Sequence, residues 1–266
     1  MNKFERLVAY ALFLMPVLWA PASSFAQSPF DGTWRTNMDQ SKVSPKPVVF
    51  SVNKGMYDCS SCSPKINVKA DGRDRSVTGQ TYDTISVREV GPKSIAVTTK
   101  KSGKTVSEQT RTVSEDGNTL TVKITYHLLN SDQPMSMEYN ATRVGKAPTG
   151  ANGTSGAWRN NKVKASENDL ITTYKSSGDE LSMSTPWGKS YTAKLDGKDS
   201  PVKGSYFYSS VSLRRIDART IEEKYKRAGK VVEVDKISVS PDGKKMTVVV
   251  TNMLTGATST YVAEKQ

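Results

Sequence analysis

Ser114-Glu-Asp-Gly-Asn-Thr-Leu-Thr-Val122 and Ser240-Pro-Asp-Gly-Lys-Lys-Met-Thr-Val248 are two copies of one motif in a chain of 266 residues. In each copy an Asp-Gly pair is followed by a run in which apolar and polar residues alternate. Asp and Gly adopt turn conformations at low cost, and a period of two is that of a strand with one buried face. The motif therefore predicts a β-hairpin in each half of the chain.

The motif belongs to a longer internal repeat. Ile85–Val122 and Val211–Val248 align without gaps and are identical at 13 of 38 positions. We therefore predict a duplicated domain, with the first copy over residues 27–144 and the second over residues 155–266. Residues 145–154 are rich in Gly, Pro and small polar residues, and we expect them to form an exposed linker between the copies.

The secondary structure that the sequence predicts is almost entirely β. Apolar residues recur with a period of two, and no helical apolar stripe follows the N-terminal region. Eight short strands joined by tight turns in about 110 residues favour an all-β fold of two tandem antiparallel up-and-down β-barrels, with a two-sheet sandwich as the alternative. The runs in the first copy are Gly32–Thr36, Val48–Asn53, Lys65–Ala70, Thr84–Val90, Ser94–Lys100, Lys104–Ser114, Thr119–Leu128 and Ser136–Val144.

The first 26 residues have the pattern of a secretory signal peptide. Lys3 and Arg6 precede a short apolar run, Leu7–Ala20, and Ser24-x-Ala26 satisfies the small-x-small cleavage rule. The run is shorter than the roughly 20 residues of a membrane span, so we expect cleavage after Ala26 rather than stable membrane insertion. The predicted location is periplasmic or secreted.

The composition restricts the chemistry. His127 is the only histidine in the chain, so a site built from several imidazoles is excluded, and we predict no metal site, no cofactor and no catalytic residues. Lys and Arg number 38 against 26 Asp and Glu, which gives a formal net charge of +12. Because the basic residues are dispersed and the chain has an export signal, an anionic ligand or envelope component is a better partner than nucleic acid.

Three local features have a structural and a functional interpretation. Cys59-Ser-Ser-Cys62 precedes Pro64 and a strand, so no helix would activate a thiol, and we favour a loop disulfide over a thiol-dependent enzyme. His127 lies on the polar side of its strand, where we expect a solvated side chain rather than a general base. Glu222 and Glu223 face opposite sides of a strand, and we interpret both as surface ion partners.

The tripeptides Gly32-x-Trp34 and Gly156-x-Trp158, each at the start of a series of hairpins, resemble the first strand of lipocalins. The chain as a whole resembles exported bacterial proteins with tandem lipocalin-like, calycin-type β-barrel domains, and the turns at Asp116-Gly117 and Asp242-Gly243 carry this likeness. The resemblance implies that both Trp side chains close a barrel beneath a basic residue of a late strand. Arg143 would have this role in the first copy, whereas the last strand of the second copy offers only Lys265.

The expected function is binding. Tyr206, Phe207 and Tyr208 are consecutive aromatic residues in a polar loop, and with Trp187 they are candidates for the rim of a ligand site. We expect a non-enzymatic protein that binds a small apolar or anionic amphipathic ligand. The alternative is a structural or interaction module of the cell envelope with filled barrels.

Overall fold

The computed structural model of the chain describes residues 28–127, 129 and 134–266; the expected signal peptide lies outside these residues. The elements are β1 (Gly32–Lys42), β2 (Val48–Asn53), β3 (Met56–Cys59), β4 (Ile66–Lys69), β5 (Arg75–Ser76), β6 (Thr84–Gly91), β7 (Ser94–Lys101), β8 (Lys104–Val113), β9 (Thr119–Tyr126), β10 (Met135–Val144), β11 (Gly156–Ala165), the 3-10 helix η1 (Glu167–Leu170), β12 (Ile171–Ser177), β13 (Glu180–Ser184), β14 (Ser190–Lys194), β15 (Asp196–Pro201), β16 (Ser210–Asp217), β17 (Thr220–Arg227), β18 (Lys230–Val239), β19 (Lys245–Asn252) and β20 (Ala257–Lys265).

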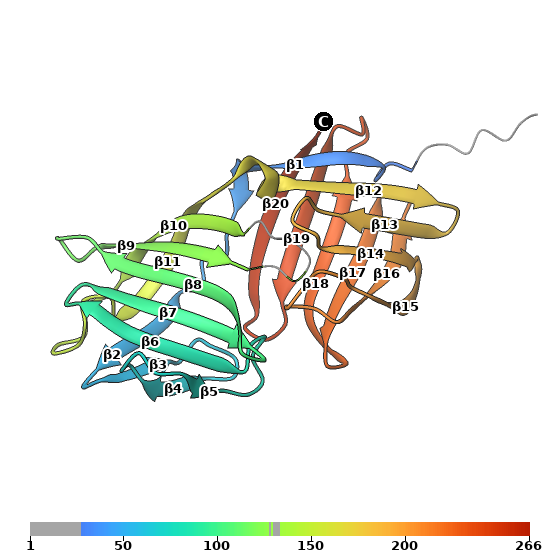
Figure 1. The fold of residues 1–266 in the computed structure, drawn as a ribbon. Coiled ribbons are helices and arrows are strands. Elements are labelled where there is room, and N and C mark those ends of the chain that lie inside the picture. Colours follow the sequence, from blue (N-terminus) through green and yellow to red (C-terminus); the bar gives the residue numbers. More distant parts are fainter. Residues whose placement is uncertain (1–27, 128, 130–133) are drawn as a thin grey trace, which may run out of the picture.

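Within the described residues these strands form two antiparallel sheets of ten strands, each curled into a nearly closed barrel (Figure 1). Barrel 1 has the strand order β4-β3-β2-β11-β10-β9-β8-β7-β6-β5, and barrel 2 has the order β14-β13-β12-β1-β20-β19-β18-β17-β16-β15. Isolated bridges join Asp71 to Arg88 and Ser190 to Lys203 where the sheet ends meet. The predicted all-β fold of two antiparallel barrels is confirmed.

Each barrel has more strands than the eight that the sequence predicted for each copy. In the first copy the additional strands are β3 and β5, which are only four and two residues long. Runs of two to four residues are at or below the shortest length that shows a period of two, so these strands give little signal in the sequence.

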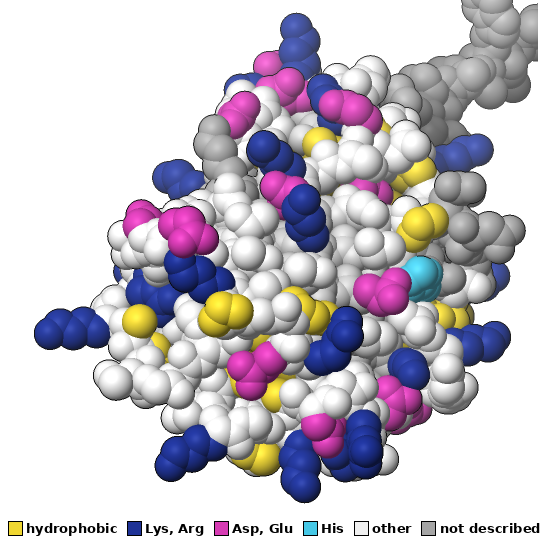
Figure 2. Space-filling view, turned by 60° about the vertical axis from the view of Figure 1, so that its left-hand side comes forward, with side chains coloured by type: hydrophobic (Ala, Val, Ile, Leu, Met, Phe, Trp, Pro, Cys, Tyr) yellow, Lys and Arg dark blue, Asp and Glu magenta, His cyan; other side chains and the backbone are white. Residues whose placement is uncertain are grey.

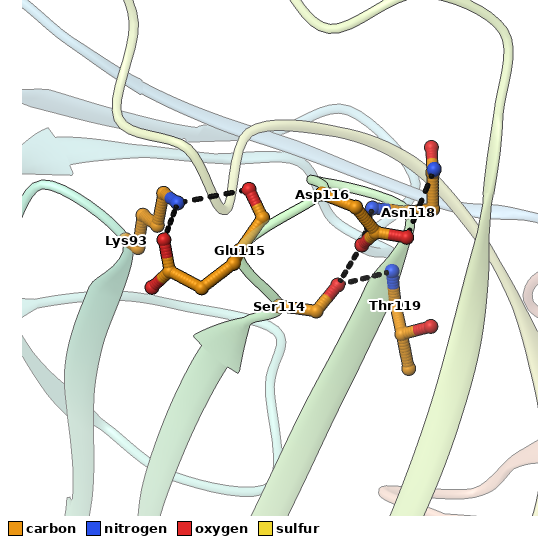
Figure 3. A network of polar contacts seen from close by, with 6 residues as sticks. All are labelled: Lys93, Ser114, Glu115, Asp116, Asn118 and Thr119. Atoms are coloured by element: carbon orange, nitrogen blue, oxygen red, sulfur yellow. Dashed lines mark hydrogen bonds and ion pairs between the residues drawn. The ribbon is translucent and has the colours of Figure 1, made fainter.

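The predicted Asp-Gly hairpin turns are held by the side chains of the repeated motif (Figure 3). Ser114 Oγ donates to Asp116 at 2.5 Å and accepts from the backbone N–H of Thr119 at 3.0 Å. In the second copy Ser240 Oγ donates to Asp242 at 2.6 Å and accepts from Lys245 at 2.9 Å. The Ser-x-Asp-Gly motif is therefore repeated because it supplies the turn's own hydrogen bonds.

The two copies exchange their first strands. β1 pairs with β12 and β20 of barrel 2, whereas β11 pairs with β10 and β2 of barrel 1. In Figure 1 the blue strand β1 accordingly lies in the barrel of the orange and red strands. The barrels thus differ from the contiguous copies 27–144 and 155–266 expected from the repeat: barrel 1 runs from β2 to β11, and barrel 2 combines β12–β20 with β1.

The connections between strands explain this exchange. Pro45 and Pro47 lie in the five residues between β1 and β2, and proline fixes an extended backbone that opposes a tight turn back. β1 therefore continues away from β2 and enters the other sheet. In contrast, β10 and β11 are antiparallel neighbours joined by residues 145–155.

Residues 145–154 are therefore a connection inside barrel 1, not a linker between barrels. Residues 145–150 are exposed, as expected, but Asn152 and Thr154 are buried. Asn152 donates from its backbone to Val52 at 2.8 Å and from its side chain to Glu89 at 3.0 Å and to Gly91 at 2.8 Å. These hydrogen bonds fix the second half of the segment on the end of barrel 1. The exposure predicted from its composition is therefore wrong for this half.

The two Gly-x-Trp tripeptides occupy equivalent places in the exchanged strands. Trp34 and Trp158 are each 1% exposed, and each donates its indole N–H to a backbone carbonyl at 2.8 Å. Arg143 lies 4.0 Å over Trp158, and Lys265 lies 5.3 Å over Trp34. Arg143 thus covers the Trp of the second copy rather than that of its own, because the strands are exchanged.

The preceding glycines make room for these basic side chains. Gly156 has φ +135°, and a Cβ there would lie 2.6 Å from Arg143 Nη1. Gly32 has φ +127°, and a Cβ there would lie 2.6 Å from Lys265 Cε. A side chain at either position would displace the cation that covers the indole.

We predict that a fragment of residues 48–165 folds into a monomeric barrel, whereas residues 27–144 do not. The second fragment lacks β11, so the edges of β2 and β10 are unpaired and favour association. Light scattering after size exclusion, with far-ultraviolet circular dichroism, measures both properties. A monomeric 27–144 fragment as stable as 48–165 would contradict the exchange.

We also predict that Arg143→Met destabilises the protein more than Lys265→Met. Arg143 donates to the carbonyls of Gly117, Ser155 and Gly153 at 2.6, 2.6 and 2.7 Å, so its loss leaves three acceptors unmatched. The expected loss of unfolding free energy is about 2–4 kcal/mol for Arg143→Met and about 1 kcal/mol or less for Lys265→Met. Urea denaturation followed by circular dichroism measures both, and equal losses would contradict the asymmetry.

Candidate functional site

Barrel 1 contains a partly open cavity of about 130 Å³. Alternate residues of β6, β7 and β8 point into the barrel, since successive side chains of a strand face opposite sides. The walls combine apolar side chains with a few polar groups, and one wall residue, Phe207, comes from the second copy. The lining residues are Tyr57, Cys62, Ile66, Thr81, Tyr82, Ile85, Val97, Thr99, Val106, Ser107, Gln109, Arg111, Tyr126 and Phe207.

Arg111 brings a positive charge to this cavity. Its guanidinium lies 4.6 Å over the ring of Phe50, Nη1 donates to Tyr57 Oη at 3.3 Å, and Nη2 donates to Gln109 at 3.0 Å. Nε is buried and has no hydrogen-bond partner. Two of the five guanidinium N–H groups are thus used, and the Nε–H is unmatched.

No anionic group of the described residues neutralises Arg111, which forms no ion pair with them. Burial raises the pKa of Tyr82 and of Tyr126 to about 12, so both phenols are neutral at neutral pH. Arg111 is half-buried, and a charge held partly away from water without a counter-ion is costly, which makes Arg111 a candidate functional residue.

The interior of barrel 2 has the opposite charge. Glu223 is 1% exposed and accepts hydrogen bonds from the hydroxyls of Tyr191 and Tyr225, the latter at 2.7 Å. Asp235 lies directly opposite Glu223 in the register of β17 and β18, and it is 8% exposed. A third carboxylate, Glu233, accepts from Tyr208 Oη at 2.7 Å.

One lysine faces these three carboxylates. Lys189 Nζ lies 4.2 Å from the ring centre of Tyr225 and 4.9 Å from that of Tyr208. Burial lowers the pKa of Lys189 and raises those of Glu223, Glu233 and Asp235. Asp235 Oδ1 is buried without a hydrogen-bond partner, so the charges of this cluster are only partly compensated.

The interpretation of Glu222 and Glu223 as two surface ion partners is wrong for Glu223. The two side chains do face opposite sides, and Glu222 pairs on the outer face with Lys224 at 3.2 Å. Glu223 faces inward between Ile221 and Tyr225, which are both buried. The alternation of Ile221, Glu223 and Tyr225 is the sequence signal that identifies the inward face.

The predicted aromatic rim is divided between the barrels. The ring of Phe207 packs edge-to-face on Tyr126 of barrel 1, with 5.9 Å between centroids, whereas Tyr208 lies 4.5 Å from Tyr225 inside barrel 2. Tyr206 lines a groove of about 830 Å³ between the barrels, together with Lys101, Arg227 and Lys230. Trp187 is half-buried in the turn between β13 and β14 and lines neither the cavity nor the groove.

Cys59, Cys62 and His127 are the remaining sequence candidates. Cys59 and Cys62 form a disulfide. His127 is exposed, and its Nε2 lies 3.1 Å from Glu108. Among the residues that the structure describes, no cluster of His, Cys, Asp or Glu is suited to a metal ion.

The outer surface carries interspersed charges. On the face shown in Figure 2, Lys and Arg alternate with Asp and Glu, and no continuous basic patch stands out. The described residues include no helix long and apolar enough to cross a membrane.

Comparisons of the chain with family models, with curated proteins and with solved structures found no match.

We predict that Asp235→Asn stabilises the protein at pH 7 and not at pH 4. Because the pKa of Asp235 is raised in the folded state, its contribution to stability is present below the ordinary pKa and is lost as the pH rises through the folded pKa. The amide cannot ionise, so we expect a gain of roughly 1–3 kcal/mol at pH 7.

Urea denaturation at pH values from 4 to 7, in steps of about 0.5 pH units, tests this difference. Glu222→Gln, on the outer face of the same sheet, is the matched control and is expected to have little effect. A gain that is independent of pH would contradict the role of the buried charge.

Proposed function

We propose that the protein is an exported, non-enzymatic binding protein and that barrel 1 takes a small organic anion, a carboxylate, on Arg111. The observation that supports this most directly is Arg111 itself, whose side chain lines the barrel 1 cavity and whose Nε–H is unmatched. The N-terminal segment, with its signal-peptide pattern, supports export to the periplasm or the medium.

The geometry of arginine suits this ligand class. A guanidinium binds a carboxylate through two parallel N–H groups, and Nε–H with a second N–H forms such a pair. Neutral hydroxyls of Thr99, Ser107, Tyr82 and Tyr126 line the same space and offer further hydrogen bonds. The carboxylate would supply the counter-charge that the described residues do not.

The size and walls of the cavity limit the rest of the ligand. A volume of about 130 Å³ corresponds to about four water molecules at roughly 30 Å³ each. Ile66, Ile85, Val97 and Val106 form apolar walls. A short-chain carboxylate with a compact apolar body therefore fits better than a long chain or a sugar acid.

The alternative, a structural module of the envelope, is favoured by barrel 2. Its interior is occupied by tyrosines and by the ion cluster of Glu223, Glu233, Asp235 and Lys189. In this alternative barrel 1 has no ligand, and Arg111 is a tolerated buried charge.

We predict that Arg111→Met weakens the binding of butanoate to barrel 1. Loss of the charge-assisted hydrogen bonds is expected to weaken binding about ten- to hundredfold. The unliganded variant is expected to be more stable than the wild type, because a buried unpaired charge is replaced by an apolar side chain of similar length.

Isothermal titration with butanoate, and urea denaturation without it, measure these two effects. Arg88→Met is the matched control, because Arg88 is exposed on the outside of barrel 1. Equal butanoate affinity in Arg111→Met and the wild type, or no binding to the wild type, would contradict the proposed function and favour the structural module.

A further inference from the structure

We infer that Phe207 of the second copy closes the barrel 1 cavity and sets the size of ligand that the cavity accepts. The inference rests on the proposed function for its ligand class, but the closure itself is a property of the loop. The first supporting observation is that Phe207 lines the cavity together with Arg111, although its backbone belongs to the connection between β15 and β16.

The position of Phe207 is determined by its neighbours in barrel 2. Ser205 Oγ accepts from the backbone N–H groups of Phe207 and Tyr208 at 3.1 and 3.3 Å, which holds the loop in a compact turn. Gly204 has φ +68°, and a Cβ there would lie 2.1 Å from Gly188 O, so the start of the loop lies directly on the adjacent turn.

Tyr208 anchors the loop from the other side. Its hydroxyl donates to Glu233, its ring packs at a tilt against that of Tyr225, and Lys189 Nζ lies 4.9 Å from its ring centre. Successive residues of the loop thus point into different barrels. The anchored Tyr208 leaves Phe207 little freedom to leave the mouth of barrel 1.

Phe207 also lies where the cavity meets the groove between the barrels. Thr81 lines both spaces, and the groove is lined by Tyr206 and Tyr208, on either side of Phe207 in the chain. Removal of the Phe207 ring would join the cavity of about 130 Å³ to the groove of about 830 Å³. Phe207 therefore lies at the side of the cavity that faces the groove.

The repeat explains why this closure is asymmetric. Phe207 is the counterpart of Thr81, and Tyr208 is the counterpart of Tyr82, at the same offset of 126 residues. Both Tyr residues face the interior of their own barrel. Only the second copy places an aromatic ring at the preceding position, so barrel 2 closes barrel 1.

The closure can be tested without a ligand. The disulfide uses both cysteines, and none is free among the described residues, so Ser107→Cys places a single thiol in the cavity wall. Methyl methanethiosulfonate should modify this thiol slowly. Adding Phe207→Ala should accelerate modification at least tenfold, whereas Tyr206→Ala, in the same loop but outside the cavity, should leave the rate unchanged.

Thr99→Cys gives a second reporter in case Ser107→Cys does not fold, because the two hydroxyls are in contact at 2.8 Å. Tyr208→Phe, which removes the bond to Glu233, should accelerate modification less than Phe207→Ala. Equal rates with and without Phe207→Ala, or equal acceleration by Tyr206→Ala, would overturn the closure.

Titration with butanoate and octanoate tests the size limit. In Phe207→Ala the affinity for octanoate should rise at least tenfold over the wild type, and that for butanoate should change less. An unchanged preference would overturn the role of Phe207 in selection. Failure of the proposed function gives a different pattern, in which the wild type binds neither acid while thiol modification still depends on Phe207.

Discussion

The pairing of each Gly-x-Trp strand with the sheet of the other copy is the constraint on which the rest of the structure depends. β11 fills the space between β2 and β10, and β1 fills the space between β12 and β20. Without these strands each sheet would have two unpaired edges where its hydrogen-bond ladder is now continuous. Each exchanged strand also carries a buried Trp. The exchange therefore completes the hydrogen-bond ladder of each sheet and adds a large apolar side chain to the core of each barrel.

The exchange holds the barrels together and so makes a shared site feasible. Phe207 reaches the cavity of barrel 1 from barrel 2, and Arg227 Nη2 donates to Gly79 O across the same interface at 3.3 Å. A loop between two freely jointed domains would lose conformational entropy on docking. Here the two exchanged strands already restrict the motion of one barrel relative to the other, so the docking of the loop costs less entropy.

Duplication has produced two interiors of opposite charge on one framework. At the offset of 126 residues Arg111 corresponds to Ile237, Gln109 to Asp235 and Val97 to Glu223. Barrel 1 therefore has a half-buried cation beside neutral tyrosines, and barrel 2 has three inward-facing carboxyls, two of them buried, near one lysine. The inward-facing side chains can differ between the copies because they lie within the strands, so changing them does not alter the turn residues.

The sequence by itself determined the all-β class, the duplication and the turns, because a period of two and the Ser-x-Asp-Gly motif act over a few neighbouring residues. It also singled out the aromatic loop with Phe207 and Tyr208 as a candidate site. It did not point to Arg111 or to the cluster around Glu223, because the sequence of a polar strand does not show which face a charged residue occupies. Only the tertiary structure decided which barrel receives β1 and β11. Both copies begin with a Gly-x-Trp strand, and the choice depends on the connections and on contacts between residues more than 100 positions apart.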